Sequence, residues 1–431
     1  VFSINIAIGE TLDVSYVGYQ MKSFLINNFN PLQITLSRSA EKSQLDEVVV
    51  VGYGTQRKSN VTGAVTSVDI EKTLGSRPIT DIGRGLQGAV PGLSVRVPSG
   101  EVGSDPLIRI RGFIGSIAGS SLPLILVNNV EIPSIQMINP NDIDEISILK
   151  DASATSIYGA KAAFGVILIT TKKGAKVQGN KLTYSGNYSW QNLAKNLEIA
   201  GIDGLQYTLD AHKNMKASGP AGGFWRISEA SLQKAREWDA KYGSTVGNYD
   251  PVVYNRDWYW DGTDKYGIRI YDPIDAMVKK NAFTQNHNLS LNGKSGNTMY
   301  NVGLGYLNQQ GMMKPARHDD FTRYTANLSL STKVTDFLTL RGGALYSDRS
   351  KRYPNSLTGF VADPWLYLYR WSLAFPTGVK ELGEIIRDPY WDTKYAHTAI
   401  SGNKYTNLNL GTTIDVTKNW QVIADYTYDI N

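Results

Sequence analysis

The feature that most constrains this chain is an alternation of apolar and polar residues that begins at Lys181 and recurs in seven segments. Successive side chains of a β-strand point to opposite faces of a sheet, so each segment predicts a strand with one apolar and one polar face. The apolar faces are clearest in five segments: Leu182, Tyr184, Gly186, Tyr188 and Trp190; Tyr300, Val302, Leu304 and Tyr306; Tyr324, Ala326, Leu328 and Leu330; Leu408, Leu410, Thr412 and Ile414; Trp420, Val422, Ala424 and Tyr426. A soluble β-sandwich and a membrane β-barrel show the same alternation, so this pattern alone does not distinguish between these two folds.

The connections between these segments are sorted by length. Tight turns around Lys294-Ser295-Gly296, Thr335-Asp336 and Thr417-Lys418 alternate with long or medium connections at residues 193–285, 310–320 and 351–404. Long loops on one side and short turns on the other are typical of bacterial outer-membrane barrels, and a sandwich has no reason to sort its loops. No stretch approaches 18 consecutive apolar residues, so no transmembrane helix is expected and a closed barrel is the fold that could cross a membrane.

Seven strands are too few to close such a barrel. A plugged outer-membrane transporter has roughly 22 strands, and an open sheet would leave unpaired edges facing lipid. The chain also begins at Val1 without a Met or an apolar leader. We therefore expect residues 177–431 to be the first part of a barrel that belongs to a longer precursor.

A mixed α/β unit is predicted before the barrel, at residues 57–176. Thr80 or Asp81 is a suitable N-cap for a short helix that Pro91-Gly92 ends, and Asp151 is a suitable cap for the turn after it. Strands are expected at residues 60–70, 106–112, 122–132, 145–149 and 165–171. Residues 43–56 form a linker, and residues 1–42 supply three short strands, around 2–6, 12–19 and 32–36, which are too few to be stable alone.

The linker ends in the run Asp46-Glu47-Val48-Val49-Val50-Val51-Gly52-Tyr53-Gly54. β-branched valines favour an extended backbone, and the glycines permit a flexible joint after it. An extended peptide can add a strand to the edge of another protein's sheet, where main-chain hydrogen bonds supply the grip. Four valines alone are more typical of an ordinary buried strand, and the coupling interpretation is favoured only when a plug and a barrel follow them.

The α/β unit contains a long series of short motifs. In chain order they are Leu86-Gln87-Gly88, Pro91-Gly92-Leu93, Ile108-Arg109-Ile110-Arg111-Gly112, Pro123-Leu124, Asn139-Pro140, Leu149-Lys150-Asp151-Ala152-Ser153-Ala154, Tyr158-Gly159 and Gly165-Val166-Ile167 to Gly174. With the valine run before them and the alternating strands after them, the chain resembles the SusC-like, RagA-type branch of the TonB-dependent outer-membrane transporters. Two positions depart from the family pattern, since Asn128-Asn129 replaces an Asp-Gly turn and Lys161 replaces an Arg. Asn tolerates the left-handed turn conformation, so we expect the fold to survive the first change.

The resemblance implies a mainly β fold: a transmembrane antiparallel β-barrel, incomplete here, with an α/β plug at 57–176. The half-domain at 1–42 would be the C-terminal half of a carboxypeptidase-regulatory-like β-sandwich. The implied function is TonB-dependent import of an oligosaccharide or peptide across the outer membrane of a Gram-negative bacterium. The implied partners are the TonB energy-coupling protein, a SusD-like lipoprotein lid and membrane lipid, with dimers of barrel–lid complexes as a further expectation. The TonB-coupling segment would comprise Asp46, Glu47, Val48, Val49, Val50, Val51, Gly52 and Tyr53.

Two further sets of residues are candidates for function. Arg109 and Arg111 alternate onto one face of a predicted strand, where they either seat the plug on carboxylates of the barrel wall or are simply solvated. The long loops are rich in aromatic residues, which bind sugars, peptides or a partner protein, or else form loop cores and the interfacial belt. For contact with the nutrient or the lid we single out Trp225, Trp258, Trp260, Trp365, Trp371 and Trp391.

Composition and motifs argue against several other classes. The 431 residues contain no cysteine, and a net charge of +5 with scattered Lys and Arg argues against a nucleic-acid partner. No P-loop or G-x-S-x-G motif occurs and the four histidines are far apart, so we expect no enzyme activity, cofactor or metal site. The turns Asp261-Gly262-Thr263-Asp264 and Asp319-Asp320 are candidates for calcium but are more typical of solvated turns. Two rival functions stay open: a passive porin or structural barrel, and a secreted β-rich adhesin or glycan-binding protein.

Overall fold

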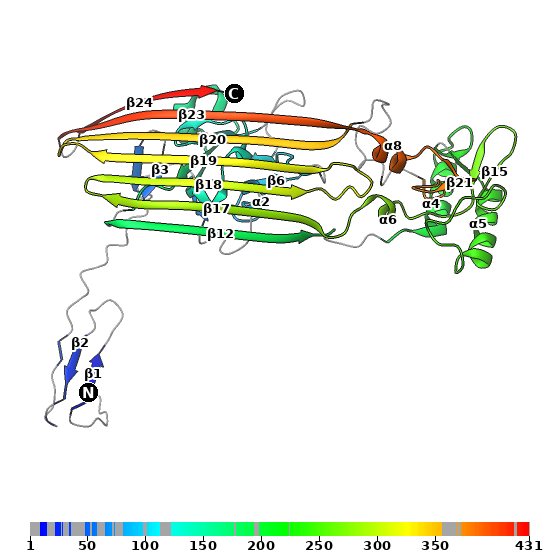
Figure 1. Cartoon of the computed structure of the whole chain (residues 1–431), viewed down its shortest axis with the longest axis horizontal. Coiled ribbons are helices and arrows are strands. Elements are labelled where there is room, and N and C mark those ends of the chain that lie inside the picture. Colours follow the sequence, from blue (N-terminus) through cyan, green and yellow to red (C-terminus); the bar gives the residue numbers. More distant parts are fainter. Residues whose placement is uncertain are drawn as a thin grey trace.

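The computed structural model describes residues 9–14, 22–26, 28, 34–35, 48–51, 54–57, 65–70, 73, 81–97, 101–112, 122–175, 178–193, 198–223, 225–355, 368, 372–417 and 420–430. Most of these residues belong to a large sheet, a plug behind it and a folded region at one end of the strands (Figure 1). Among them, no helix is both long enough and apolar enough to cross a bilayer.

The large sheet, here called the wall, has seven antiparallel strands that follow one another in chain order. They are β12 Gly179–Gln191, β17 Ala282–Ser295, β18 Thr298–Gln310, β19 Asp320–Lys333, β20 Leu338–Asn355, β23 His397–Thr417 and β24 Trp420–Ile430. The tight turns at 295–298, 333–338 and 417–420 all lie at one end, and the long connections lie at the other (Figure 1). The predicted strands and the sorting of their connections are confirmed, and the described sheet is open at β12 and β24.

The two faces of the wall have opposite polarity. The register aligns apolar residues of neighbouring strands, so that Tyr306 lies opposite Tyr324 and Leu304 opposite Ala326. On this face Tyr324 and Leu410 are exposed, whereas the polar residues Asn301, Asn327, Ser347 and Asn407 of the other face are buried. An apolar exposed face and a polar covered face are the arrangement expected of a sheet that faces lipid.

The plug contains a five-stranded sheet in the order β5-β10-β11-β8-β9. These strands are β5 Val65–Asp69, β8 Leu124–Val127, β9 Val130–Glu131, β10 Ile143–Leu149 and β11 Val166–Thr171, and β6 Leu93–Arg96 pairs separately with β7 Leu107–Ile110. β10 is antiparallel to both of its neighbours, and β11 is parallel to β8. Fully buried isoleucines at 146, 148, 167 and 169 form the core, which explains why the first four residues of β11 are all apolar.

Short helices and turns connect the plug strands. They are α2 Ile82–Gly85, η2 Ile135–Met137, η3 Pro140–Asp142, α3 Ala152–Thr155 and η4 Ser156–Ala162. Asp81 caps α2 as predicted, because its Oδ1 accepts a hydrogen bond from the Gly83 amide at 2.8 Å. Asn128 and Asn129 have φ values of 48° and 71°, so the left-handed turn predicted for this pair is also confirmed. Asp151 precedes α3 but makes no side-chain cap; the predicted cap is wrong, since its carboxylate is engaged by Arg111.

The first long connection folds into a region with its own core instead of a simple loop. It contains α4 Gly201–Asn214, α5 Glu229–Tyr242, α6 Pro273–Met277 and a small sheet of β13 Ala221–Gly222, β14 Arg226–Ile227, β16 Lys265–Gly267 and β15 Trp258–Trp260. The connection between β20 and β23 adds β21 Lys380–Glu381, β22 Glu384–Ile385 and α8 Pro389–Tyr395. Ala374 from the second connection packs with Leu205 and Leu232 from the first, so the two share one core. We call residues 198–281 and 372–396 the loop domain.

The N-terminal part contributes two small hairpins. β1 Thr11–Val14 pairs with β2 Lys22–Leu25, and β3 Val48–Val51 pairs with β4 Gly54–Arg57. Of the three strands predicted in this part, 12–19 overlaps β1, whereas residues 34–35 are not in a strand and 2–6 lie outside the described residues. The strand at β2 was not predicted.

Candidate functional site

Two arginines of the wall reach the plug from neighbouring strands. Arg323 of β19 and Arg349 of β20 lie opposite each other in the register, on the polar face. Arg323 Nη1 donates to the Gln136 carbonyl at 2.9 Å, and Arg349 Nη1 donates to Ser134 Oγ at 2.8 Å. Both acceptors belong to η2 or to its cap, so this short helix is held by two cations of the wall.

A second pair of contacts extends this attachment toward the long connections. Lys351, two residues beyond Arg349, forms a 2.6 Å ion pair with Glu101 of the plug. Arg349 also lies 3.7 Å from Asp105. We use the term latch for the three wall cations (Arg323, Arg349 and Lys351) and their plug partners (Glu101, Asp105, Ser134 and Gln136). Because most of these groups are shielded from water, their charge-assisted bonds are stronger than those of surface pairs.

In the latch, the charges on the plug and on the wall are the reverse of those predicted for the contact between them. Arg109 lies in β7, but Arg111 follows the strand with a φ of 58° and forms an ion pair with Asp151 inside the plug. The expected partnership of Arg111 with a wall carboxylate is therefore wrong. In the latch the cations stand on the wall and the carboxylates on the plug.

Close packing of the plug on wall strands β17 and β18 supplements the latch. Asn139 Nδ2 donates to Asn288 Oδ1 of β17 at 2.7 Å, while its own Oδ1 accepts from the Asn141 amide. A Cβ at Gly305 of β18 would collide with the Asn139 side chain. Asn139 thus turns the plug chain into η3 and contacts the wall at the same time.

Asp142 is a buried carboxylate in this contact. A Cβ at Gly303 of β18 would collide with it, and its Oδ2 has no hydrogen-bond partner among the described residues. Burial raises the pKa of Asp142 to about 6, although Lys172 and Arg323 oppose the rise. An ionised Asp142 therefore weakens the seat of the plug, because its charge is incompletely solvated there.

The predicted coupling segment is partly visible. Val48–Val51 are extended as β3 and pair with β4, whereas Asp46, Glu47, Gly52 and Tyr53 lie outside the described residues. In the part of the chain that the structure describes, the second edge of β3 has no partner strand. That edge can accept a strand from another protein.

Most of the candidate tryptophans with described positions belong to the interior of the loop domain. Trp225 is buried against Trp258 and Phe375, with ring centroids 5.0 and 5.1 Å away, and Trp391 is buried with its Nε1 donating to the Val379 carbonyl at 3.0 Å. Trp258 is half-buried and its Nε1 donates to Glu381 Oε1 at 2.8 Å. Trp260 is 55% exposed. Trp365 and Trp371 lie outside the described residues.

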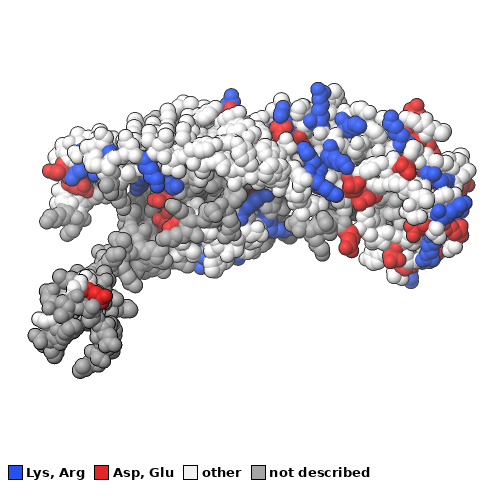
Figure 2. Space-filling view, turned by 60° about the horizontal axis from the view of Figure 1, so that its bottom comes forward, with Lys and Arg blue, Asp and Glu red and all other residues white. Residues whose placement is uncertain are grey.

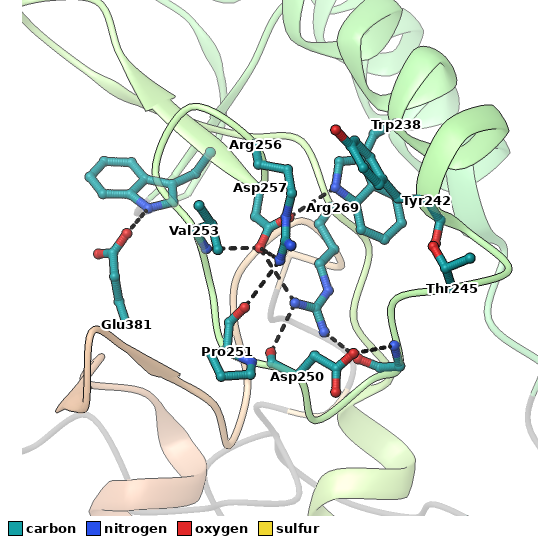
Figure 3. A network of polar contacts seen from close by, with 12 residues as sticks. Trp238, Tyr242, Thr245, Asp250, Pro251, Val253, Arg256, Asp257, Arg269 and Glu381 are labelled. Carbon is teal, nitrogen blue, oxygen red and sulfur yellow. Dashed lines mark hydrogen bonds and ion pairs between the residues drawn. The ribbon is translucent and has the colours of Figure 1, made fainter.

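A polar network beside these rings fixes the shape of the loop domain (Figure 3). At its centre the fully buried Asp257 accepts from Trp238 Nε1 at 2.9 Å and from Arg256 Nη2 at 2.7 Å. Burial alone would raise the pKa of Asp257, but these hydrogen bonds and one from the Val253 amide outweigh it and lower the pKa. Arg269 Nη1 lies 3.5 Å from the same carboxylate. The network has the character of a structural centre, because its groups bond to one another.

In the acidic turns considered for calcium, the carboxylates bond to nearby groups of the protein. Asp261 Oδ1 accepts from the amides of Thr263 and Asp264, both at 2.8 Å. Asp320 is paired with Arg352 at 2.9 Å, and Asp319 Oδ2 accepts from the Met313 amide. Among the described residues, no group of three or more His, Asp or Glu side chains is placed to hold a metal ion.

Known proteins share this architecture. Residues 57–166 match the model of the TonB-dependent Receptor Plug Domain. The TonB-dependent receptor SusC of Bacteroides thetaiotaomicron is 28% identical over 365 residues, which cover 82% of this chain and 31% of the relative. The TonB-dependent receptor P39 of Formosa agariphila is 31% identical over 375 residues, with coverages of 83% and 31%.

A solved structure agrees with these relatives. The RagAB peptide importer in its open-open state matches with a TM-score of 0.60 and 26% identity, over 89% of this chain and 42% of that one. The chain belongs to the SusC-like TonB-dependent receptors. It spans about a third of the length of the two curated relatives described above.

The residues of this SusC-like receptor that the sequence did not identify are the wall cations of the latch. Arg323, Arg349 and Lys351 each stand at an inward position of β19 or β20, where most of the other inward residues are uncharged. A charge at a covered position of an alternating strand is a signal that could have found them. What could not be read from the strand pattern is which plug group each cation meets.

Proposed function

We propose that this chain forms the plug and part of the wall of an active importer in the outer membrane of a Gram-negative bacterium. The observation that carries this proposal is a folded plug held by the latch against the polar face of a sheet whose apolar face is exposed. A passive pore has no use for a body seated in its lumen. A secreted adhesin would gain nothing from an exposed apolar face, which favours aggregation.

We propose that the TonB protein supplies the energy through residues 46–53. The free edge of β3 offers main-chain donors and acceptors to an incoming strand, and a two-stranded hairpin is weak enough on its own to be rearranged by it. Force applied to β3 then travels along the chain to the first strand of the plug sheet, β5.

We propose that β5 is the part of the plug that moves first, and its position in the sheet supports this. β5 is an edge strand, paired with β10 from Val65–Leu149 to Asp69–Glu145. Ser67 and Ser147 both donate to Glu145 Oε1, which adds a side-chain link between these two strands. The latch holds η2 and residues 101–105, which do not belong to β5. Tension on the N-terminal side therefore separates β5 from β10 while the rest of the plug stays seated, and a path opens.

The nutrient proposed is an oligosaccharide or a peptide, and the RagAB structure is that of a peptide importer. We further propose a SusD-like lipoprotein as a lid over the loop domain, with dimers of barrel–lid complexes as the assembly. Among the described tryptophans we retain Trp260 as a candidate contact with the nutrient or the lid, because Trp225 and Trp391 are buried. Trp365 and Trp371, which lie outside the described residues, stay candidates as well.

A proline at Val49 tests the energy coupling. Val49→Pro removes one main-chain donor from β3, whereas Val49→Thr keeps both the donor and the β-branched shape. A panel of oligosaccharides and peptides first identifies a nutrient whose uptake depends on the receptor. We expect Val49→Pro to abolish that uptake and Val49→Thr to retain most of it, with both plugs resistant to limited proteolysis. Normal uptake by a folded Val49→Pro receptor would contradict TonB coupling at this segment.

A further inference from the structure

Two neighbouring hollows lie on the exposed face of the wall, across strands β18 and β19. One has a volume of about 430 Å³ and is lined by apolar and aromatic side chains, among them His287, Leu289, Leu304, Tyr306 and Tyr324. The other has a volume of about 370 Å³ and is lined by four cationic side chains, Lys279, Lys314, Arg317 and Arg352, together with the carboxylates of Asp319 and Asp320. We call them the apolar hollow and the cationic hollow.

A row of rings crosses the apolar hollow. Tyr184, His287, Tyr306 and Tyr324 come from four successive strands, with centroid separations of 6.2, 6.1 and 5.1 Å along the row. Tyr184 and His287 are also joined by a hydrogen bond of 2.8 Å. Leu289 and Leu304 continue the hollow toward the tight-turn end of the strands. Such a row is typical of the aromatic girdle that marks the edge of the hydrocarbon region.

The cationic hollow lies beyond this row, at the end of the strands where the long connections begin. Tyr306 and Gln310 are four residues apart on β18, which corresponds to about 13 Å along a strand. Arg352, Asp320 and Gln310 are neighbours across β20, β19 and β18, on the same outward face as Tyr306 and Tyr324. Figure 2 shows Lys and Arg side chains gathered where the mostly uncharged wall meets the loop domain. The cationic hollow is thus placed at the depth of lipid headgroups.

Two lysines of this hollow are hydrogen-bonded to neutral groups. Lys279 Nζ donates to Gln310 Oε1 at 3.0 Å, and Lys314 Nζ donates to the Asp275 carbonyl at 2.8 Å and to the Tyr249 hydroxyl at 3.0 Å. Arg352, by contrast, is paired with Asp320. Among the described residues neither lysine forms an ion pair, so both can bind an anion that enters from the membrane side, although the Asp275 carboxylate also attracts Lys314.

We propose that the two hollows form one binding site for a phosphorylated lipid of the outer leaflet, of the lipid A type. The phosphate would lie between Lys279 and Lys314, and an acyl chain would follow the ring row into the apolar hollow. The inference rests on the proposed outer-membrane location, and it adds a specific lipid contact on the outer face of the wall. An amphiphile is favoured over a free anion because the two hollows are neighbours along β18, where Asn308 of the cationic hollow stands two residues from Tyr306 of the apolar hollow.

The test measures lipid binding to the whole receptor purified from outer membranes. Native mass spectrometry in detergent counts bound monophosphoryl lipid A for the unaltered receptor and for Lys279→Gln with Lys314→Gln. The matched control is Lys234→Gln with Lys241→Gln, the same loss of two charges on α5 of the loop domain. Each cation near an anionic lipid surface contributes about 1 kcal/mol, or roughly a fivefold change in affinity, so we expect about a thirtyfold loss for the first pair and none for the control.

Three further arms separate the sources of the anion. Dephosphorylated lipid A should bind as weakly to the unaltered receptor as lipid A binds to the Lys279→Gln, Lys314→Gln variant. Inorganic phosphate at millimolar concentration should not displace lipid A, because it lacks the acyl chain. Equal binding of lipid A to the variant and to the unaltered receptor would overturn the proposal, and so would displacement by phosphate alone. Uptake by the variant, measured in parallel, shows separately whether the transporter itself still works.

Discussion

At the scale of single residues, Asp142 links the seat of the plug to pH. Its folded-state pKa of about 6 lies above the ordinary value of 3.8 for an aspartate. A carboxylate with a raised pKa binds its proton more tightly in the folded protein than in the unfolded one. The stability that it contributes is therefore present at low pH and is lost as the pH rises from about 4 to 6.

Replacing this carboxylate should remove that dependence. Asp142→Asn keeps the shape of the side chain beside Gly303 but carries no charge. We expect the plug of this variant to be more stable above pH 6, by roughly 1–3 kcal/mol, and to show a flatter stability profile between pH 4 and 6. Calorimetric unfolding of the receptor in detergent at several pH values measures both quantities. A variant that is less stable than the parent at pH 8 would show that the ionised carboxylate is well solvated in the seat.

Single residues also show where sequence reasoning succeeds. The left-handed turn at Asn128-Asn129 and the cap at Asp81 were predictable because they depend on neighbours in the chain. The ion pair of Arg111 with Asp151 was not, since it depends on the positive φ at Arg111, and the strand ends before that residue, at Ile110. A two-residue periodicity assigned both Arg109 and Arg111 to a single face and missed this break.

At the scale of elements, the latch joins η2 of the plug to β19 and β20 of the wall. Arg323 is buried, and its removal leaves the Gln136 carbonyl without this donor. Losing such a charge-assisted bond costs about 1–3 kcal/mol. This loss weakens the contact between the plug and the wall. The wall itself is not destabilised, because its strands keep their main-chain hydrogen bonds.

Electrical conductance measures how firmly the plug is held against the wall, because a loosened plug lets ions pass. We expect Arg323→Met receptors in planar bilayers to show frequent openings of a size that the parent shows rarely. The matched control is Arg341→Met on β20, since Arg341 pairs with Asp425 of β24 within the wall. If Arg323→Met and Arg341→Met leave the receptor equally closed, the latch does not hold the plug.

The elements differ in how well they could be predicted from the sequence. The wall strands were predictable because alternation over a dozen residues is a long, regular signal. The helices of the loop domain were not predicted, although Ser228 caps α5 and its buried residues Leu232, Ala235 and Trp238 recur at helical spacing. The aromatic content of this connection suggested a binding surface, whereas most of the described tryptophans turned out to form its core.

At the scale of the whole molecule, the proposed import requires that β5 separates from the rest of the plug along its pairing with β10. The wall and the latched part of the plug stay together, and β5 is the strand that tension reaches first. This division depends on long-range pairing, between residues 65–69 and 145–149, and on contacts between the plug and strands up to 274 positions away. No local pattern contains such information, which is why the sequence predicted a plug but not its attachment.

A reversible lock between β5 and β10 tests this central claim most directly. Ser67 and Ser147 lie opposite each other in the two strands, and this chain contains no cysteine. Ser67→Cys with Ser147→Cys therefore introduces one disulfide at the proposed line of parting. The control is Thr298→Cys with Thr332→Cys, an opposite pair of β18 and β19 whose hydroxyls are 3.0 Å apart.

The measurement is uptake of the identified nutrient by cells under oxidising and reducing conditions, with disulfide formation checked by mass. The account predicts that the β5–β10 disulfide stops uptake, that reduction restores it, and that the disulfide within the wall has no effect in either state. Undiminished uptake through receptors in which the β5–β10 disulfide is fully formed would contradict it.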